Sequence, residues 1–345
     1  MTASLRIVAA GPGLTVQDLG RPGHAAQGLS RGGALDPLAL HEAAALLHSR
    51  PAAAIEMPGM GGSFSVDIPT RVALTGAPMK ATLDGAPLRW HAAHPIAPGQ
   101  ILKIGGVERG VVGYLTPGAP IATSPVLGSR AAHLNIGIGA VLQSGDCLPL
   151  SDDPAPSRPA CHLPGAGPFG ARFNGGTVRL VPGPQSDMFD DAQRAALGQA
   201  TFVRGPRSNR QAMQLISQDD PTWHRAAGDL ASEPIQAGDV QITGDGTPFV
   251  LLAECQTIGG YPRIGSVHPA DMGRIVQAGP APALHLSFIG WEDAEALLAS
   301  HLAALARLPA SVMPLVRDPA DIPDLLSYQL ISGVTSGDDL DPTAR

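Results

Sequence analysis

The sequence predicts a mainly β protein, built as a barrel or a sandwich with a few short helices. Two observations lead to this fold class. Short apolar runs alternate with turn signals about every 8 to 12 residues, and those turns draw on 42 glycines and 34 prolines. The apolar content of 44% is high enough to form a core, which excludes a disordered chain.

The expected elements follow in order from the N-terminus. A first strand over residues 5–9 precedes a long glycine-rich loop. Asp36 at the N-cap and Pro37 at the first helical position predict a helix that ends near Ser49. The segments that then read as strands are AAAIEMP, GSFSVDI, RVALTG, KATLDG, QILKIG and GVVGYLT.

The second half of the chain repeats the β pattern over residues 177–289. Its segment DVQITGDGTPFVLLA predicts two strands joined by an Asp-Gly hairpin turn. The helical spacing of apolar residues over 291–308 predicts a closing helix.

A chain of 345 residues exceeds the size of one ordinary core, so we expect two modules. The predicted division is an N-terminal β module at 1–150, a proline-rich linker at 151–170, a second β module at 171–290, and a C-terminal helix and tail at 291–345. The tail beyond Gly337 is expected to fray.

Charge and composition exclude several classes of partner. A net charge of −7 argues against binding to nucleic acid or to an anionic membrane. There is no apolar run of about 18 residues and no signal-peptide pattern, so the expected location is cytoplasmic. The three cysteines lack a C-x-x-C pair, so neither a disulfide framework nor a metal site is expected.

Four short motifs are weak. GLSRG fits G-x-S-x-G, but Ser30 follows a loop and no helix starts directly after it. His91 and His94 could ligate a metal, but with no third ligand nearby we expect surface histidines. The sequence around Lys80 lacks the second Met of a biotin-carrier hairpin, and G-x-G near the N-terminus lacks a third glycine. The sequence has no P-loop motif, so the chain offers no P-loop of its own for a nucleotide.

Three clusters of polar residues and glycines point to a binding site. In the first, TVQDLGRPG and GGALD crowd a loop whose glycines permit close backbone approach; its candidate residues are Gln17, Asp18, Arg21 and Asp36. The alternative is that Asp18 pairs with Arg21 only to order the loop. The second cluster, LGSR, supplies Arg130.

The third cluster joins SNRQAMQLI, which supplies Arg210, to QTIGGYPRIG. Amide, hydroxyl and guanidinium groups there can bind an amide or a carboxylate, and two bare glycine N–H groups can form an anion-binding nest. The candidate residues are Gln256, Thr257, Gly259, Gly260, Tyr261 and Arg263. The alternative is a wide hairpin with a packed tyrosine.

These clusters, in this order, resemble the family of allophanate hydrolase subunit 2, the Kip antagonist and the C component of bacterial 5-oxoprolinase. The family also contains half of the carboxyltransferase domain of urea carboxylase. The matching stretches are GLTVQDLGRPG, GALD, AIE, LTGAP, LGSR, SGD, SNRQAMQL, VQITGDGTPFVLLAECQTIGGYP and ADM. The resemblance covers residues 5–289. Departures from the family pattern include Ala212, Gln214 and Cys255, and they bear on the substrate rather than on the fold.

The resemblance implies a cyclophilin-like β-barrel architecture with two barrel-like modules. It also implies a paralogous partner of related fold, the B component, with which the chain forms the site, and a separate A component. The implied activity is that of an ATP-dependent 5-oxoprolinase complex that converts 5-oxoproline to glutamate. ATP is then used by the complex, at a site on a partner or shared with it, and the substrate is a small amide or lactam.

Two other functions remain open. One is a biotin-dependent carboxyltransferase component acting on urea or a similar amide, which brings in biotin as a cofactor. The other is a non-catalytic regulatory protein that binds a kinase inhibitor, like the Kip antagonist.

Both chemistries place negative charge on an amide oxygen, which requires preorganised donors. The implied catalytic residues are Gln256, Thr257, Tyr261 and Asp18, with Asp36 as an alternative general base. The substrate-binding residues are Gln17, Arg21, Asp36, Arg130, Arg210, Gly259, Gly260 and Arg263. Cys255 adjoins this set, but a strand thiol is expected to be buried and inert.

Overall fold

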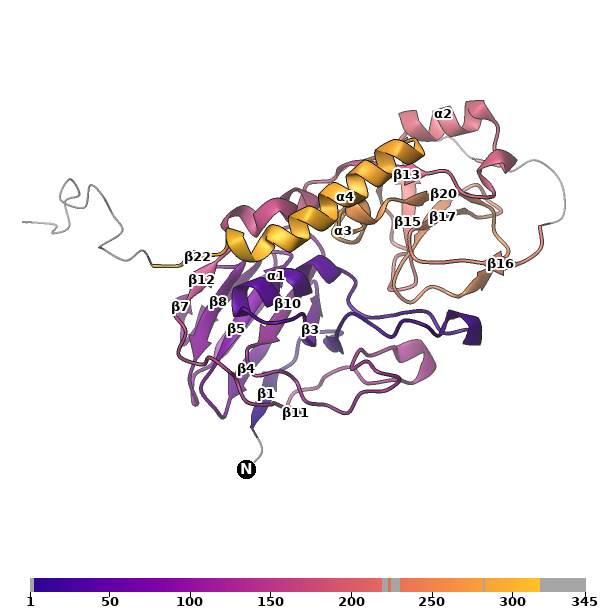
Figure 1. Cartoon of the computed structure of the whole chain (residues 1–345). Coiled ribbons are helices and arrows are strands. Elements are labelled where there is room, and N and C mark those ends of the chain that lie inside the picture. The colour runs from indigo at the N-terminus through magenta and orange to yellow at the C-terminus, as the bar shows by residue number, and fades with distance from the viewer. Residues whose placement is uncertain (1–2, 219–222, 225–229, 282, 317–345) are drawn as a thin grey trace, which may run out of the picture.

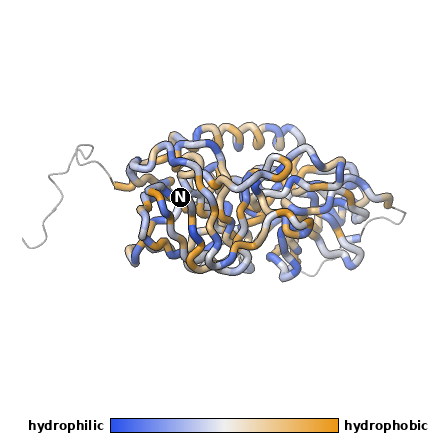
Figure 2. Tube along the Cα trace, turned by 90° about the horizontal axis from the view of Figure 1, so that it is seen from below, coloured by the Kyte–Doolittle hydropathy of each residue, from blue (hydrophilic) through white to orange (hydrophobic). Residues whose placement is uncertain are grey.

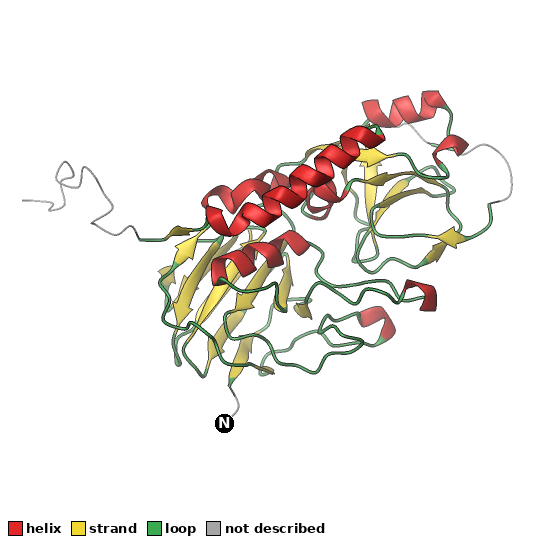
Figure 3. Ribbon diagram, in the orientation of Figure 1, coloured by secondary structure: helices red, strands yellow, loops and turns green. Residues whose placement is uncertain are grey.

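The structure is a computed structural model that describes residues 3–218, 223–224, 230–281 and 283–316. Its strands gather into two groups, the first built mainly from the N-terminal half of the chain with β22 (Met313–Pro314) added from the other end, the second from residues 176–288 (Figure 1). The longer helices lie along one side of these groups (Figure 3). The prediction of a mainly β, barrel-containing fold is confirmed.

The first group contains two sheets. In hydrogen-bonded order, the six-stranded sheet is β11 (Cys147–Pro149), β1 (Ser4–Ala9), β4 (Ser63–Val66), β9 (Leu102–Val107), β6 (Met79–Leu83) and β7 (Ala86–Pro87). The seven-stranded sheet is β2 (Thr15–Gln17), β3 (Ala54–Pro58), β10 (Val112–Pro117), β5 (Thr70–Gly76), β8 (Ala92–Ile96), β12 (Cys161–His162) and β22 (Met313–Pro314).

The two sheets share one apolar core. Ile7 and Phe64 of the first sheet contribute to it together with Ile55 and Leu74 of the second. Burial alternates along β4, as expected where one face of a strand meets solvent. In contrast, β5 and β10 are buried along their whole lengths, because helix α1 (Pro37–Leu47) packs on the seven-stranded sheet.

The second group is a closed barrel. Its order is β13 (Gly176–Val181), β20 (Arg263–Val267), β17 (Asp239–Ile242), β18 (Pro248–Leu251), β15 (Ala212–Ser217), β14 (Thr201–Arg204) and β21 (Leu284–Phe288). The hairpin predicted around Asp245 joins β17 to β18. A separate two-stranded sheet pairs β16 (Glu233–Pro234) with β19 (Ile258–Gly259).

The remaining helices are short, except α4. They are α2 (Asp191–Gln199), α3 (Met272–Val276) and α4 (Trp291–Arg307), with 3-10 turns η1 (Ala25–Gln27), η2 (Leu134–Ile136), η3 (Pro164–Phe173), η4 (Ser186–Met188), η5 (Pro269–Asp271) and η6 (Leu308–Ser311). In Figure 1, α4 runs from the barrel to the first module. On its predicted apolar face only Ala294 is fully buried, while Leu298 and Leu302 are exposed.

Helix α1 starts where the sequence predicts and ends two residues early. Asp36 occupies the N-cap position, but its side chain makes no capping hydrogen bond. The expected capping role is therefore wrong, because the carboxylate turns toward Arg172 and Gln277 instead. The helix ends at Leu47, since His48 takes a left-handed conformation with φ 53°.

The two modules are joined by a continuous core. One apolar cluster runs from barrel residues such as Val178 and Leu286 to Leu40 of α1 and Val112 of β10, so the junction excludes water over part of its area. Figure 2 shows apolar residues distributed through both modules rather than gathered in one. The predicted linker at 151–170 contains β12, which pairs with β8 in the first module. The division into 1–150, 151–170, 171–290 and 291–345 stays a prediction, and most of the tail lies outside the described residues.

In the part of the chain that the structure describes, no helix combines the length and apolar character needed to cross a bilayer. The expectation of surface positions for His91 and His94 is wrong. Both are buried, at 8% and 5% exposure, because α1 packs against β8 and the ring of Phe173 in η3 lies against His91.

Candidate functional site

Two glycine-rich loops meet at the junction of the modules. The N–H of Gly32 donates to the carbonyl of Ala253 at 3.0 Å, and Arg210 Nη2 donates to the carbonyl of Gly33 at 2.5 Å. Gly33 has φ 86°, and a Cβ there would lie 2.6 Å from the backbone nitrogen of Gly20. Only glycine allows this approach, which folds the loop at 17–34 on itself. The hydrogen bond from Gly32 to Ala253 then holds the loop against the segment after β18.

Arg210 lies between two buried carboxylates at this junction. Its Nε donates to Glu254 at 2.5 Å, and its Nη1 donates to Glu56 of β3. Burial lowers the pKa of Arg210, but the charges of Glu56 and Glu254 outweigh it, so the pKa lies above its usual value. Glu56 also accepts from the hydroxyl of Tyr114 at 2.7 Å. Burial, and then the charge of Glu56, raise the pKa of that hydroxyl well above its usual value.

Beside Arg210 the structure gathers three polar side chains that keep an atom without a partner. They are held along residues 131–133: Gln17 donates to the carbonyl of Ala132 at 3.2 Å, and Arg21 donates to that of Ala131. Gln17 Oε1, Arg21 Nη1 and His133 Nδ1 are buried and have no hydrogen-bond partner among the described residues. Each buried polar atom left unpaired lowers the stability of the fold by about 1–3 kcal/mol. A ligand that bound these atoms would remove that penalty, so this cluster is a candidate ligand site.

Two of these atoms face the same small gap. Gly32 has φ 61°, and a Cβ built on it would lie 3.4 Å from Arg21 Nη1 and 3.7 Å from His133 Nδ1. No other heavy atom of the described residues outside its chain neighbours lies within 4 Å of that point. The missing side chain of Gly32 therefore leaves an atom-sized space between a guanidinium and an imidazole.

Electrostatics around the gap favour a charged arginine beside a neutral histidine. Burial lowers the pKa of His133; the nearby charge of Glu254 raises it, and Arg21 and Arg210 lower it again. Burial also lowers the pKa of Arg21, against the charges of Asp18 and Glu254, but an arginine pKa starts so far above neutral that the guanidinium keeps its charge. At neutral pH the gap therefore offers guanidinium donors and an uncharged ring nitrogen.

Asp18 and Arg130 adjoin this cluster but have internal partners. The Asp18 carboxylate accepts from Gly20 N at 2.8 Å, from Ser129 Oγ at 2.6 Å and from Arg130 N at 2.7 Å. The side chain of Arg130 donates from Nε to the carbonyl of Thr123 at 2.8 Å. Asp18 therefore orders the loops that carry Arg21, through backbone and hydroxyl donors rather than through a direct ion pair.

Asp36 belongs to a second buried network. It accepts from Arg172 Nε and from Gln277 Nε2, both at 2.8 Å, and its Oδ1 has no partner among the described residues. Arg172 also donates to Glu42 at 2.7 and 2.9 Å. The backbone N–H of Asp36 donates to Tyr114 at 2.9 Å, which links this network to Glu56.

The segment 256–263 lies on the outside of the barrel. Gln256 is exposed and Tyr261 is 51% exposed. Gly259 pairs with Glu233 in the two-stranded sheet, and neither Gly259 nor Gly260 has a positive φ. The segment lacks the αR–αL backbone geometry of an anion-binding nest. Across the described residues, it shares no hydrogen bond or ion pair with the loop that holds Gln17, Asp18 and Arg21.

Arg263 is held by the barrel itself. Its Nη2 donates to Glu233 at 2.7 Å, and its Nε donates to Gln185 at 3.2 Å. A substrate carboxylate would have to displace these partners. The backbone of Thr257 accepts from Ile235 N at 3.0 Å, which fixes the start of the same segment.

Sequence analysis missed His133, Arg172 and Gln277, and it treated Glu56 and Glu254 only as parts of motifs. Local sequence contains no signal for the first three, because they are isolated polar residues whose partners are remote in the chain. Cys255 is buried, and burial, followed by the charge of Asp239, raises the pKa of its thiol to about 11. This agrees with the expectation of an inert thiol.

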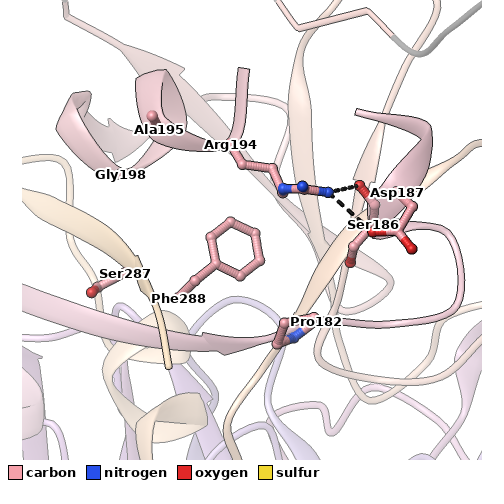
Figure 4. Close-up of a pocket in the computed structure, with 8 residues that line it drawn as sticks. All are labelled: Pro182, Ser186, Asp187, Arg194, Ala195, Gly198, Ser287 and Phe288. Carbon is pink, nitrogen blue, oxygen red and sulfur yellow. Dashed lines mark hydrogen bonds and ion pairs between the residues drawn. The ribbon is translucent and has the colours of Figure 1, made fainter. Parts of the chain in front are cut away.

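A cavity of about 470 Å³ lies elsewhere, between α2 and β21 (Figure 4). Arg194 reaches into it and donates to the carbonyl of Ser186 at 2.9 Å, and it pairs with Asp187 at 3.2 Å. Phe288 supplies an apolar wall. None of the predicted site residues lines this cavity. Among the described residues, no three His, Cys, Asp or Glu side chains are grouped to hold a metal.

The fold and the match to known proteins define a carboxyltransferase-type domain. Residues 27–288 match the family described as carboxyltransferase domain, subdomain A and B, and the chain belongs to this family. Two relatives are named as the C component of 5-oxoprolinase. The Escherichia coli protein is 32% identical over 296 residues, or 84% of this chain and 93% of that protein. The Haemophilus influenzae protein is 28% identical over 292 residues, or 82% and 90%.

More distant relatives share the fold within larger proteins. The urea amidolyase of Saccharomyces cerevisiae is 24% identical over 325 residues, which cover 88% of this chain and 18% of that protein. The crystal structure of TTHA0988 is 28% identical with a TM-score of 0.74, and the match covers 83% of this chain and 56% of that one. The urea amidolyase structure from K. lactis has a TM-score of 0.78 at 21% identity, covering 92% of this chain and 21% of that one, which shows the shared fold.

Proposed function

We propose that this chain is the C component of a cytoplasmic 5-oxoprolinase complex, which opens the lactam of 5-oxoproline to glutamate with hydrolysis of ATP. The observation that carries the proposal is the 32% identity to the C component of Escherichia coli 5-oxoprolinase, over 93% of that relative. Free thiols at the three cysteines agree with a reducing compartment. The sequence has no P-loop motif, so ATP is assigned to a partner protein or to a site shared with one.

The cluster of Gln17, Arg21 and His133 at the junction of the modules is the proposed substrate site. Opening a lactam places charge on the amide oxygen, and buried donors stabilise such charge better than water does. Arg21 Nη1 is a charged donor in a closed environment. Gln17 donates from Nε2 to Thr15 and to Ala132, and its Oε1, unpaired among the described residues, is free to accept from a substrate N–H. Glu56 and Glu254 fix Arg210, so Arg210 is proposed to hold the two loops together and to set the local field.

The exposed residues Gln256 and Tyr261 and the partly exposed Thr257 are proposed to contact the substrate or the paralogous B component after assembly. Their exposure in the single chain supports this, because a tyrosine half open to solvent is typical of an interface. The A component is the proposed third member of the complex.

The decisive test is ATP-dependent release of glutamate from 5-oxoproline by this chain co-expressed with the A and B components. We expect glutamate only when all three are present. Arg21→Met should lower kcat/KM at least a hundredfold, since one buried donor to a developing oxyanion contributes about 3–4 kcal/mol. Arg89→Met, on the turn before β8, is the matched control and should leave turnover unchanged. Equal turnover without this chain would refute the proposal.

A second candidate is a biotin-dependent carboxyltransferase component. The matched family and the alignment with urea amidolyase favour it. It predicts that turnover requires bicarbonate and a biotinylated carrier, and that avidin abolishes it. Glutamate formation that is insensitive to avidin would favour the 5-oxoprolinase function.

A further inference from the structure

His133 is a buried histidine with no assigned role; His91 and His162 also keep an unpaired Nδ1 in the described part of the chain, but the Nδ1 of His133 lies at the gap left by Gly32. Its side chain is 4% exposed, it directly precedes η2, and its Nδ1 has no partner among the described residues. That nitrogen lies 3.7 Å from the position that a Cβ on Gly32 would take, and Arg21 Nη1 lies 3.4 Å from the same point.

The neighbours of His133 decide which hydrogen-bonding role its two nitrogens take. Nε2 lies 3.9 Å from the Glu254 carboxylate, and a carboxylate on that side favours the tautomer with hydrogen on Nε2. Nδ1 then carries the lone pair. Arg21 Nη1 can only donate. The gap therefore presents one donor and one acceptor, each within 4 Å of the same point.

This pairing matches one edge of a particular chemical group. A lactam ring forces its amide to be cis, so that the carbonyl oxygen and the N–H point to the same side. A secondary amide in an open chain is almost always trans and directs them to opposite sides. A primary amide also offers both groups on one side.

We propose that Arg21 and His133 recognise the cis-amide edge of a lactam, with Arg21 Nη1 donating to the lactam oxygen and His133 Nδ1 accepting from the lactam N–H. This inference rests on the proposed function, and it assigns to His133 a direct substrate contact. Gly32 is part of the site, because any side chain at that position would fill the space that the amide edge enters.

Neutral His133 is required for this contact. Burial lowers the pKa of the ring, the Arg21 and Arg210 charges lower it further, and Glu254 opposes them. Lactam binding should therefore be constant near neutral pH and weaken in acid, as Nδ1 gains a proton and loses its lone pair.

The test measures binding of three probes to the assembled complex by calorimetry without ATP: 5-oxoproline, 2-pyrrolidinone and N-methyl-2-pyrrolidinone. We expect the first two to bind and the N-methyl compound to bind at least tenfold more weakly, since it lacks the N–H. His133→Phe should weaken binding of 2-pyrrolidinone at least tenfold and remove the discrimination against the N-methyl compound. His133→Asn, which keeps an acceptor near Nδ1, should restore part of the affinity without the weakening in acid.

Two further variants test whether a loss of binding comes from the site itself or from a general loss of structure. Gly32→Ala should abolish lactam binding while the far-ultraviolet circular dichroism is retained. His94→Phe replaces another buried histidine, in β8, whose Nε2 lies 2.8 Å from the Arg89 carbonyl, and it should leave affinity for all three probes unchanged. The thermal midpoint of each variant is recorded beside its affinity.

The outcomes separate the two proposals. If the complex turns over 5-oxoproline but binds the N-methyl compound equally well, or if His133→Phe changes no affinity, the role of His133 is refuted and the proposed function stands. If the lactams bind with the expected pattern but no glutamate forms, the proposed function fails and the recognition site stands. A wild-type complex that binds none of the probes overturns the recognition site.

Discussion

Glu42 is a buried carboxylate through which acid is expected to destabilise this protein. It lies on α1 with no exposed surface, and its carboxylate accepts from Arg172 at 2.7 and 2.9 Å. His91 Nδ1 lies 3.8 Å from it. Burial by itself would raise the pKa of Glu42, but the charge of Arg172 and then the contact with His91 outweigh it and lower the pKa to about 2.

The size of this effect follows from the shift. The pKa falls from its ordinary 4.5 to about 2, and each unit corresponds to about 1.4 kcal/mol, which gives about 3 kcal/mol of stability. Because the folded-state pKa lies below the unfolded one, this stability is fully present above the unfolded value. It is lost as the pH falls from about 4.5 through about 2.

Glu42→Gln tests this reasoning by urea denaturation followed by circular dichroism between pH 7 and pH 3. The variant should lose about 3 kcal/mol or more at pH 7, since it leaves the Arg172 charge undercompensated, and its stability should fall less steeply below pH 4.5. Glu295→Gln, an exposed position on α4, is the control and should follow the wild type. If Glu42→Gln keeps the full wild-type dependence on pH, the acid-labile contribution does not come from Glu42.

Three shorter predictions concern the junction and the thiols. Arg210→Met should lower the free energy of unfolding by about 3–5 kcal/mol, because it leaves two buried carboxylates unpaired; a loss below 1 kcal/mol in urea titration would contradict this. Gly33→Ala should lower the free energy of unfolding by about 2–4 kcal/mol, because the φ of Gly33 is 86° and a Cβ there would lie 2.6 Å from the backbone nitrogen of Gly20. An unchanged urea midpoint would show that the loop can shift. Cys255, whose pKa burial raises to about 11, should react with iodoacetamide at pH 8 far more slowly than exposed Cys147, as followed by mass spectrometry; equal rates would show that the segment opens.

The sequence by itself determined the elements whose signals are local. The Asp-Gly turn at Asp245 set the hairpin between β17 and β18, and Asp36 followed by Pro37 set the start of α1. The motifs also identified the family, because Gln17, Arg21 and their glycines stand at fixed spacing within one loop. These features depend on neighbours a few residues apart, which a single sequence displays directly.

Only the tertiary structure decided which of these side chains are free to bind. Arg172 and Gln277 reach Asp36 from 136 and 241 residues away, and they turn a predicted cap into part of a buried network. His133 meets Arg21 because the 131–133 segment packs beside the 17–21 loop. Burial and hydrogen-bond partners are properties of long-range packing, which a single sequence does not display. Arg210 and Arg263 were expected to bind a substrate carboxylate, but in the structure each is paired with carboxylates of the chain itself.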